Sequence, residues 1–184
     1  MSESVEFDPV DRVTIGAVGP PGKRVFLIQA THRGRVLSWV IEKGQAVALD
    51  FGAFSLLSQI GEQEMIREVL GVGLLGSYSE EFAAAMQLSE SEPAFRVDPG
   101  SMSMGYDEAR QLVTISFAEM LSEDEPGEPA TVRLWLTHRQ LAALGIQART
   151  VAAQGRPVCP MCGNVKEDGH TCPVSASNGH AAKG

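Results

Sequence analysis

Residues 131–136 read Thr-Val-Arg-Leu-Trp-Leu, and the chain continues directly as Thr-His-Arg-Gln. The first stretch predicts a β-strand. Thr137 then stands where a helix N-cap is expected, and Gln140 follows three residues later, which is the spacing of a capping box. The predicted helix begins at His138 and ends at about Ala153, and its apolar stripe is Leu141, Leu144, Ala148 and Val151.

An earlier passage has the same order. Residues 36–41 read Val-Leu-Ser-Trp-Val-Ile, and apolar residues recur at helical spacing from Gln45 to about Gln59. The shared pattern is Trp39, Gln45, Ala48 and Leu49 against Trp135, Gln140, Ala143 and Leu144. This repeat predicts two duplicated units of three strands and a helix. A chance recurrence of Trp and Gln is the alternative, and the pattern leaves open whether the units form one sheet or two.

The rest of the chain adds short strands and helices. Strands are predicted at residues 13–18, 25–30, 94–97 and 111–117, and helices at residues 62–70 and 80–88. The predicted fold class is α+β, with an antiparallel sheet, helices on one face and a C-terminal zinc knuckle. Residues 1–154 form the predicted body, and residues 155–184 form the tail.

Composition restricts the function classes. The chain has 184 residues with 15 Lys and Arg against 23 Asp and Glu, so its formal net charge is -8. This charge argues against nucleic-acid binding, because phosphate attraction requires a basic face. The N-terminus lacks the basic and apolar regions of a secretory signal, and no apolar run approaches the roughly 20 residues of a membrane span. A cytoplasmic protein without a membrane segment is expected.

The three cysteines are confined to the tail. Cys159 and Cys162 form a C-x2-C pair followed by glycine, and Cys172 supplies a third thiolate. Such a pair directs two thiolates at one zinc ion, and a structural zinc site has four ligands. His170 is the expected fourth ligand because it lies two residues before Cys172 in an extended segment. The predicted metal ligands are therefore Cys159, Cys162, His170 and Cys172.

Two alternatives to this ligand set stay open. His180 is the other candidate for the fourth position, and a tail with three free thiols and no metal is the second alternative. Given zinc, a structural site is favoured over a catalytic one, because a catalytic zinc keeps an open coordination position. The nearby carboxylates, Glu167 and Asp168, lie only in the segment that joins the two ligand pairs.

Other motifs give no catalytic constellation. Residues 71–76 spell G-x-G-x-x-G, but the preceding residues predict a helix rather than the strand that a dinucleotide site requires, so a glycine loop that ends this helix is favoured. His32 and His138 have no partner by spacing. Four arginines are candidates for an anion pocket, although sequence alone does not bring them together: Arg33, Arg35, Arg96 and Arg133.

Three features of the sequence occur together in a known family. They are the strand at residues 132–136 that leads into a helix, the motif Arg-Pro-Val-Cys-Pro-Met-Cys-Gly at residues 156–163, and the motif Gly-His-Thr-Cys-Pro at residues 169–173. Across nearly its whole length the chain resembles the actinobacterial family called domain of unknown function 3090. The resemblance implies no activity, substrate or partner.

These observations favour an intracellular zinc-binding protein that acts as a binding or regulatory module with a structural zinc site. Its expected partner is a protein or a small anionic ligand. An enzyme acting on a small anionic or phosphorylated substrate is the alternative, with His32 or His138 beside a carboxylate. A nucleic-acid or ribosome-associated module led by the knuckle is the third candidate.

Overall fold

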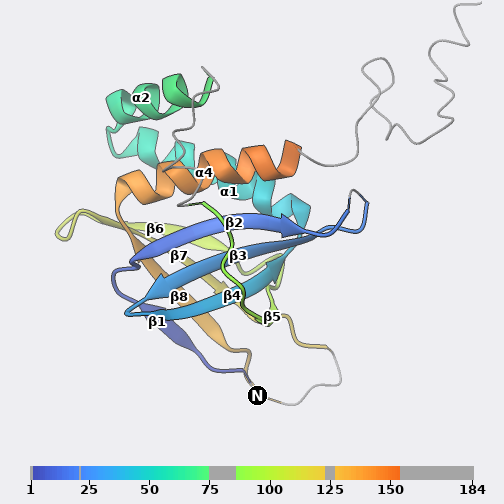
Figure 1. The fold of residues 1–184 in the computed structure, drawn as a ribbon. Helices are drawn as coiled ribbons and strands as arrows, with labels where there is room; N and C mark the ends of the chain where they lie inside the picture. Colours follow the sequence, from blue (N-terminus) through green and yellow to red (C-terminus); the bar gives the residue numbers. More distant parts are fainter. Residues whose placement is uncertain (1, 21, 75–85, 123–126, 154–184) are drawn as a thin grey trace, which may run out of the picture.

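The computed structural model describes residues 2–20, 22–74, 86–122 and 127–153 (Figure 1). Within this part, strands and helices make an α+β fold with two four-stranded sheets and three helices. None of the described helices is both long enough and apolar enough to span a membrane.

The first sheet has the strand order β2-β3-β4-β5, with β2 (Arg12–Val18), β3 (Val25–His32), β4 (Arg35–Ile41) and β5 (Pro93–Arg96). Strands β2, β3 and β4 form an antiparallel meander, and β5 pairs parallel with β4. The β3–β4 turn holds Arg33 and Gly34 at φ values of 49° and 79°. These two left-handed residues make the tight hairpin that matches strand twist.

The second sheet has the strand order β1-β8-β7-β6, with β1 (Val5–Phe7), β6 (Ser103–Asp107), β7 (Leu112–Ala118) and β8 (Thr131–Leu136). Strands β6, β7 and β8 form an antiparallel meander, and β1 pairs parallel with β8. The prediction of a purely antiparallel sheet is therefore wrong. Each sheet is mixed because its fourth strand comes from a distant part of the chain.

The two halves repeat one order of elements, four strands and then a helix. Strand β1 opens the first half but pairs in the second sheet, and β5 opens the second half but pairs in the first sheet. The predicted unit of three strands and a helix is present in both halves, each with an additional short strand before it. The two units form two sheets rather than one.

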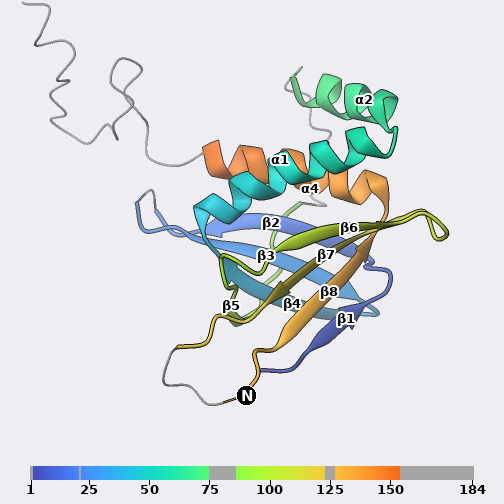
Figure 2. The same ribbon diagram turned by 180° about the vertical axis from the view of Figure 1, so that it is seen from behind.

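The helices lie together on one side of the molecule. Helices α1 (Lys43–Gln59) and α4 (His138–Ala153) pack against each other above β2 and β6, and α2 (Gln63–Leu74) lies beyond them (Figures 1 and 2). Helix α2 includes Gly71 and Gly73, so the predicted glycine loop does not begin at residue 71, and Gly76 lies outside the described residues. The predicted helix at residues 80–88 lies largely outside the described residues.

Equivalent glutamines clamp the two halves to each other. Gln45 accepts from the backbone N–H of Glu42 (2.7 Å) and donates to the carbonyl of Asp98 (3.4 Å). Gln140 accepts from the N–H of Thr137 (2.9 Å) and donates to the carbonyl of Asp11 (3.4 Å). Each glutamine completes the cap of its own helix and also binds the chain that enters from the other half.

The core is a continuous cluster between the two sheets and the helices. Trp39 is fully buried there, with its ring centroid 5.2 Å from that of Phe117 and 6.4 Å from that of Phe95. Trp135 points the other way, since it alternates with the buried Leu134 and Leu136. Matching Trp39 to Trp135 was therefore wrong. The residue of the second half that corresponds to Trp39 is Leu134, because each lies three residues before the N-cap of the following helix. Trp135 lies one residue further along the strand, and such a shift places a side chain on the opposite face of the sheet.

Helices α1 and α4 are also joined by a charged pair. The Arg149 guanidinium donates to both carboxylate oxygens of Asp50, at 2.9 and 3.0 Å. The Asp50 side chain is only 8% exposed. A methyl group added at Gly145 would lie 3.1 Å from Ala53, so glycine permits the close approach of the two helices.

A candidate ligand groove on the second sheet

The outer face of the second sheet, which points away from the core, carries polar side chains. In β7 and β8 every second residue is buried, which leaves Ser116, Arg133 and Trp135 on the outer side. The strand registers place Glu6, Arg133, Ser116 and Ser103 side by side on β1, β8, β7 and β6. We call these four residues the second-sheet row.

A groove of about 550 Å³ lies over this face. Its polar lining combines four hydroxyl groups with one cationic and one anionic side chain: Ser4, Ser101, Ser116, Thr131, Arg133 and Glu6. The rest of the lining is apolar and consists of Val5, Phe117, Ala118 and Val132. A volume of this size is typical of small-ligand sites. Because hydroxyl and guanidinium groups both donate hydrogen bonds, this lining suits a ligand rich in acceptor oxygens.

Three of the four groove hydroxyls already take part in hydrogen bonds within the protein. Ser101 donates to the carbonyl of Asp98 (2.8 Å) and accepts from the N–H of Ala118 (2.9 Å). Ser4 accepts from both the backbone N–H (3.0 Å) and the hydroxyl (3.3 Å) of Thr131. Within the described part of the chain, neither Ser116 nor Arg133 has a side-chain hydrogen bond or an ion pair. All the donors of these two neighbours are therefore unused.

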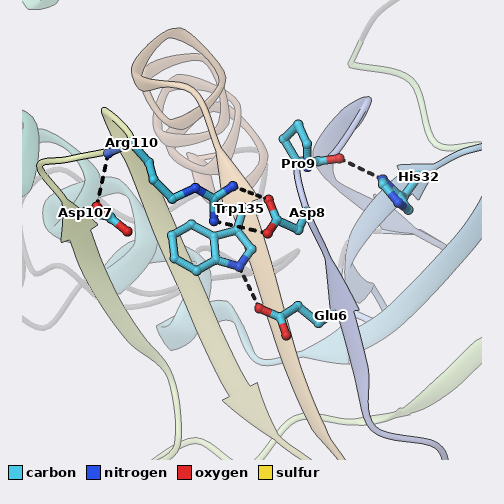
Figure 3. A network of polar contacts seen from close by, with 7 residues as sticks. All are labelled: Glu6, Asp8, Pro9, His32, Asp107, Arg110 and Trp135. Carbon is cyan, nitrogen blue, oxygen red and sulfur yellow. Dashed lines mark hydrogen bonds and ion pairs between the residues drawn. The ribbon is translucent and has the colours of Figure 1, made fainter.

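Beside the groove lies a cluster that we call the Trp135 clasp, formed by Trp135, Arg110, Asp8 and Glu6 (Figure 3). The Arg110 guanidinium lies 4.3 Å from the centroid of the indole, and both of its terminal nitrogens donate to Asp8. The indole N–H donates to Glu6 at 2.7 Å. The clasp connects β1 to the β6–β7 turn across β8, and it meets the groove at Glu6, the one clasp residue in the groove lining.

The clasp also sets the electrostatics of this wall. The hydrogen bonds from Arg110 hold the pKa of the Asp8 carboxyl below its ordinary value, and the same bonds raise the pKa of Arg110. The Glu6 carboxylate lies opposite Arg133 in the strand register but is bonded to the Trp135 indole. Within the described residues Arg133 forms no ion pair, so the donors of its guanidinium are free to contact a ligand, while Glu6 adds a negative charge to the same groove.

A second hollow of about 380 Å³ lies between α1 and the segment before β6. Its lining is apolar or neutral, with Leu49, Leu56, Met102 and Met104 beside Gln45. It contains no charged side chain, and Gln45 is already committed to the helix cap. The groove on the second sheet is therefore the stronger candidate for specific recognition.

The predicted metal ligands lie outside the described residues. These are Cys159, Cys162, His170 and Cys172, and the alternative ligand His180 lies there as well. Among the described residues, no three His, Cys, Asp or Glu side chains gather as a metal site would require.

The four candidate arginines do not come together. Arg133 lines the groove, whereas Arg35 pairs with Glu3 at 2.8 Å and Arg33 occupies the β3–β4 turn. Arg96 lies on β5 in the other sheet. An anion site built from several of these arginines is therefore not formed, and a single guanidinium among hydroxyls takes its place.

The two candidate histidines have separate surroundings. The His32 ring stacks on Phe7, and its Nδ1 lies 2.7 Å from the carbonyl of Pro9 (Figure 3). His138 Nδ1 lies 2.6 Å from a carboxylate oxygen of Glu62, while its buried Nε2 has no partner among the described residues. Neither histidine lines the groove.

Sequence reasoning missed the groove residues other than Arg133. The alternation of Leu112, Thr114 and Ser116 with buried residues was the available signal, since it predicts an outward polar face. Nothing in the local pattern indicated that Ser4 and Ser101 would border that face.

Comparison with known proteins places the chain in a family. A search of curated proteins and a search of solved structures each gave no match. Residues 5–172 match the model of the family described as "Protein of unknown function (DUF3090)". Since this match covers most of the chain, the chain belongs to that family.

Proposed function

We propose that this protein is a binding module that takes an anionic group of a ligand in the second-sheet groove. The observation that carries the proposal is the pair Arg133 and Ser116, which offers unused donors inside a hollow lined by further hydroxyls. A carboxylate or a phosphate group satisfies a guanidinium with paired hydrogen bonds. Glu6 lines the same groove, but its carboxylate accepts from the Trp135 indole and forms no ion pair with Arg133 in the described part of the chain.

The lining favours binding over catalysis. A general acid or base should lie within hydrogen-bond reach of the reacting group, and nucleophilic hydroxyls require an activating base. No histidine lines the groove, and Glu6 is already hydrogen-bonded. The groups present can hold and orient a ligand.

The test is titration of the full chain with sodium succinate and, separately, sodium phosphate, followed by backbone amide chemical shifts. Arg133→Gln should weaken the tighter of the two by about tenfold or more, because it removes a charge-assisted hydrogen bond. Arg96→Gln, which removes an exposed arginine from the other sheet, is the matched control. Equal affinity in wild type and Arg133→Gln would refute the proposal.

We further propose that the tail carries a structural zinc ion held by Cys159, Cys162, His170 and Cys172. The C-x2-C spacing supports this set, as does the position of His170 two residues before Cys172. Elemental analysis should give near one zinc per chain, lost in Cys159→Ser and His170→Ala and kept in His180→Ala. Zinc retained in His170→Ala and lost in His180→Ala would identify the other histidine.

The pair of His138 and Glu62 supports a second candidate, an enzyme that acts on a phosphorylated substrate. A carboxylate beside one imidazole nitrogen is the arrangement of many acid–base pairs, but the other nitrogen of His138, Nε2, is buried, so a substrate could reach it only after the surrounding side chains move. The test is hydrolysis of p-nitrophenyl phosphate by the full chain. Turnover that His138→Gln abolishes would favour the enzyme, whereas the binding module should show no turnover above buffer.

A further inference from the structure

The outer face of the first sheet, unlike that of the second, is covered by the chain itself. Residues 86–89, which we call the covering segment, cross it just before β5. Resting on the proposed function, we infer that the second-sheet groove binds an extended peptide segment of a partner protein, with an acidic side chain of that segment on Arg133.

The two outer faces correspond residue by residue. Trp39 and Leu134 each lie three residues before their helix cap, and they pair with Ile28 and Ile115 respectively. The neighbouring outward residues form a first-sheet row of Thr14, Gln29 and Ser38. Their counterparts in the second-sheet row are Ser103, Ser116 and Arg133.

The first-sheet row shows how this face holds an extended chain. The Thr14 hydroxyl donates to the carbonyl of Met86 at 2.6 Å. The Gln29 amide donates to the carbonyl of Ser89 (2.9 Å) and accepts from its N–H (2.8 Å). One glutamine therefore satisfies both backbone groups of a residue that crosses the sheet, without any strand pairing. All three row residues are buried.

A glycine in each sheet marks the difference in coverage. A methyl group added at Gly16 would lie 2.7 Å from Leu88 of the covering segment. At the equivalent Gly105 the nearest atom is Oγ1 of Thr114, which belongs to the sheet itself. Three members of the second-sheet row, Glu6, Ser116 and Arg133, line the groove, whereas Ser103 lines the second hollow.

The substitutions along the row specify the chemistry of the occupant. Gln29 has both a donor and an acceptor, which match a peptide group, whereas its counterpart Ser116 is too short to span one. The long side chain of the second-sheet row is instead Arg133, on the neighbouring strand, where the first-sheet row has Ser38. A guanidinium only donates, and its planar fork matches a carboxylate. We therefore expect Arg133 to bind a side-chain carboxylate of the peptide, whereas the first-sheet row binds only backbone groups of the covering segment.

The dimensions favour a peptide over a small ion. A water molecule occupies about 30 Å³ of liquid, and an inorganic anion equals only a few waters, so it would leave most of the 550 Å³ groove unfilled. Three neighbouring strands span roughly 10 Å, and an extended chain covers that distance with about three or four residues. The four-residue covering segment crosses the first sheet on this scale.

The experiment is selection from a library of acetylated, amidated heptapeptides, randomised at every position, with the full chain as target. Selected peptides should share Asp or Glu at one position, and the best should bind Arg133→Gln at least about tenfold more weakly. Replacing the acidic residue of the best peptide by Asn or Gln should weaken its binding to wild type by the same factor. The same replacement should leave its affinity for Arg133→Gln unchanged. Arg96→Gln should bind as wild type does.

The double variant Ser116→Gln with Arg133→Ser copies the first-sheet row and should lose the preference for acidic peptides over their amide versions. If no peptide is selected, or if selected peptides bind Arg133→Gln as tightly as wild type, the inference is wrong. Succinate or phosphate binding that depends on Arg133 would then still support the proposed function. If neither a peptide nor succinate or phosphate binds in a way that depends on Arg133, both proposals are wrong.

Discussion

The outer faces of the two sheets share one backbone plan and differ in what lies on them. In the first sheet, Thr14, Gln29 and Ser38 are buried beneath the covering segment, and β2 and β3 are buried on both faces. In the second sheet, Ser116 and Arg133 of the equivalent row border a groove, and Arg133 is a cation without a partner among the described residues. The comparison indicates that one face contributes to stability and the other is available for binding.

The largest expected effect is at the centre of the two rows. Gln29→Leu would leave the backbone N–H and carbonyl of Ser89 without their protein partner, so it should lower the free energy of unfolding by about 2–3 kcal/mol. Ser116→Val, the same type of change in the open row, should alter it by less than about 0.5 kcal/mol. Urea unfolding compares the two variants. Equal losses would show that the rows do not differ in this way.

A smaller effect is expected from the covering segment itself. Leu88 is half-buried over Gly16, so Leu88→Ala should lower the free energy of unfolding by about 1–2 kcal/mol, below the range for a fully buried leucine. The exposed neighbour gives the control, since Gln87→Ala should have no measurable effect. Thermal unfolding suffices for the measurement. An unchanged midpoint for Leu88→Ala would indicate that the covering segment does not stabilise the first sheet.

The sequence predicted the elements better than their partners. Strands β2, β3, β7 and β8 and the helices α1 and α4 were identified from local periodicity, because burial on one face imposes that pattern. Strand β1 was missed because Val5–Phe7 has only three residues, and β6 was missed because Ser103–Asp107 contains no β-branched residue. The parallel pairing of β1 and β5 joins residues far apart in sequence, which no local pattern encodes.

The candidate site was predictable only in part. Arg133 could be proposed as an anion ligand from its type, but its isolation from Arg33, Arg35 and Arg96 follows from the strand order. The difference between Trp39 and Trp135 was hidden for a related reason. The two share a sequence context, and only the strand register reveals that they face opposite ways.

The smallest effect is expected at the Trp135 clasp, which has no equivalent on the first sheet. The folded pKa of Asp8 lies below its unfolded value of about 3.9, so its stabilisation is complete above that pH and is lost as the pH falls through the folded pKa. Acrylamide quenching of Trp135 should therefore increase below about pH 4. In Asp8→Asn the quenching should be high at neutral pH and independent of pH. Quenching that still follows pH in that variant would exclude Asp8 as its cause.

The central claim is that the open row of the second sheet is the binding surface. The most direct test is the arginine Nε–Hε spectrum of the full chain during titration with sodium succinate. The largest shift among the arginines should belong to Arg133, with Arg96 unchanged and Ser116 showing the largest nearby backbone shift. A spectrum in which Arg133 does not move while another arginine does would contradict the account.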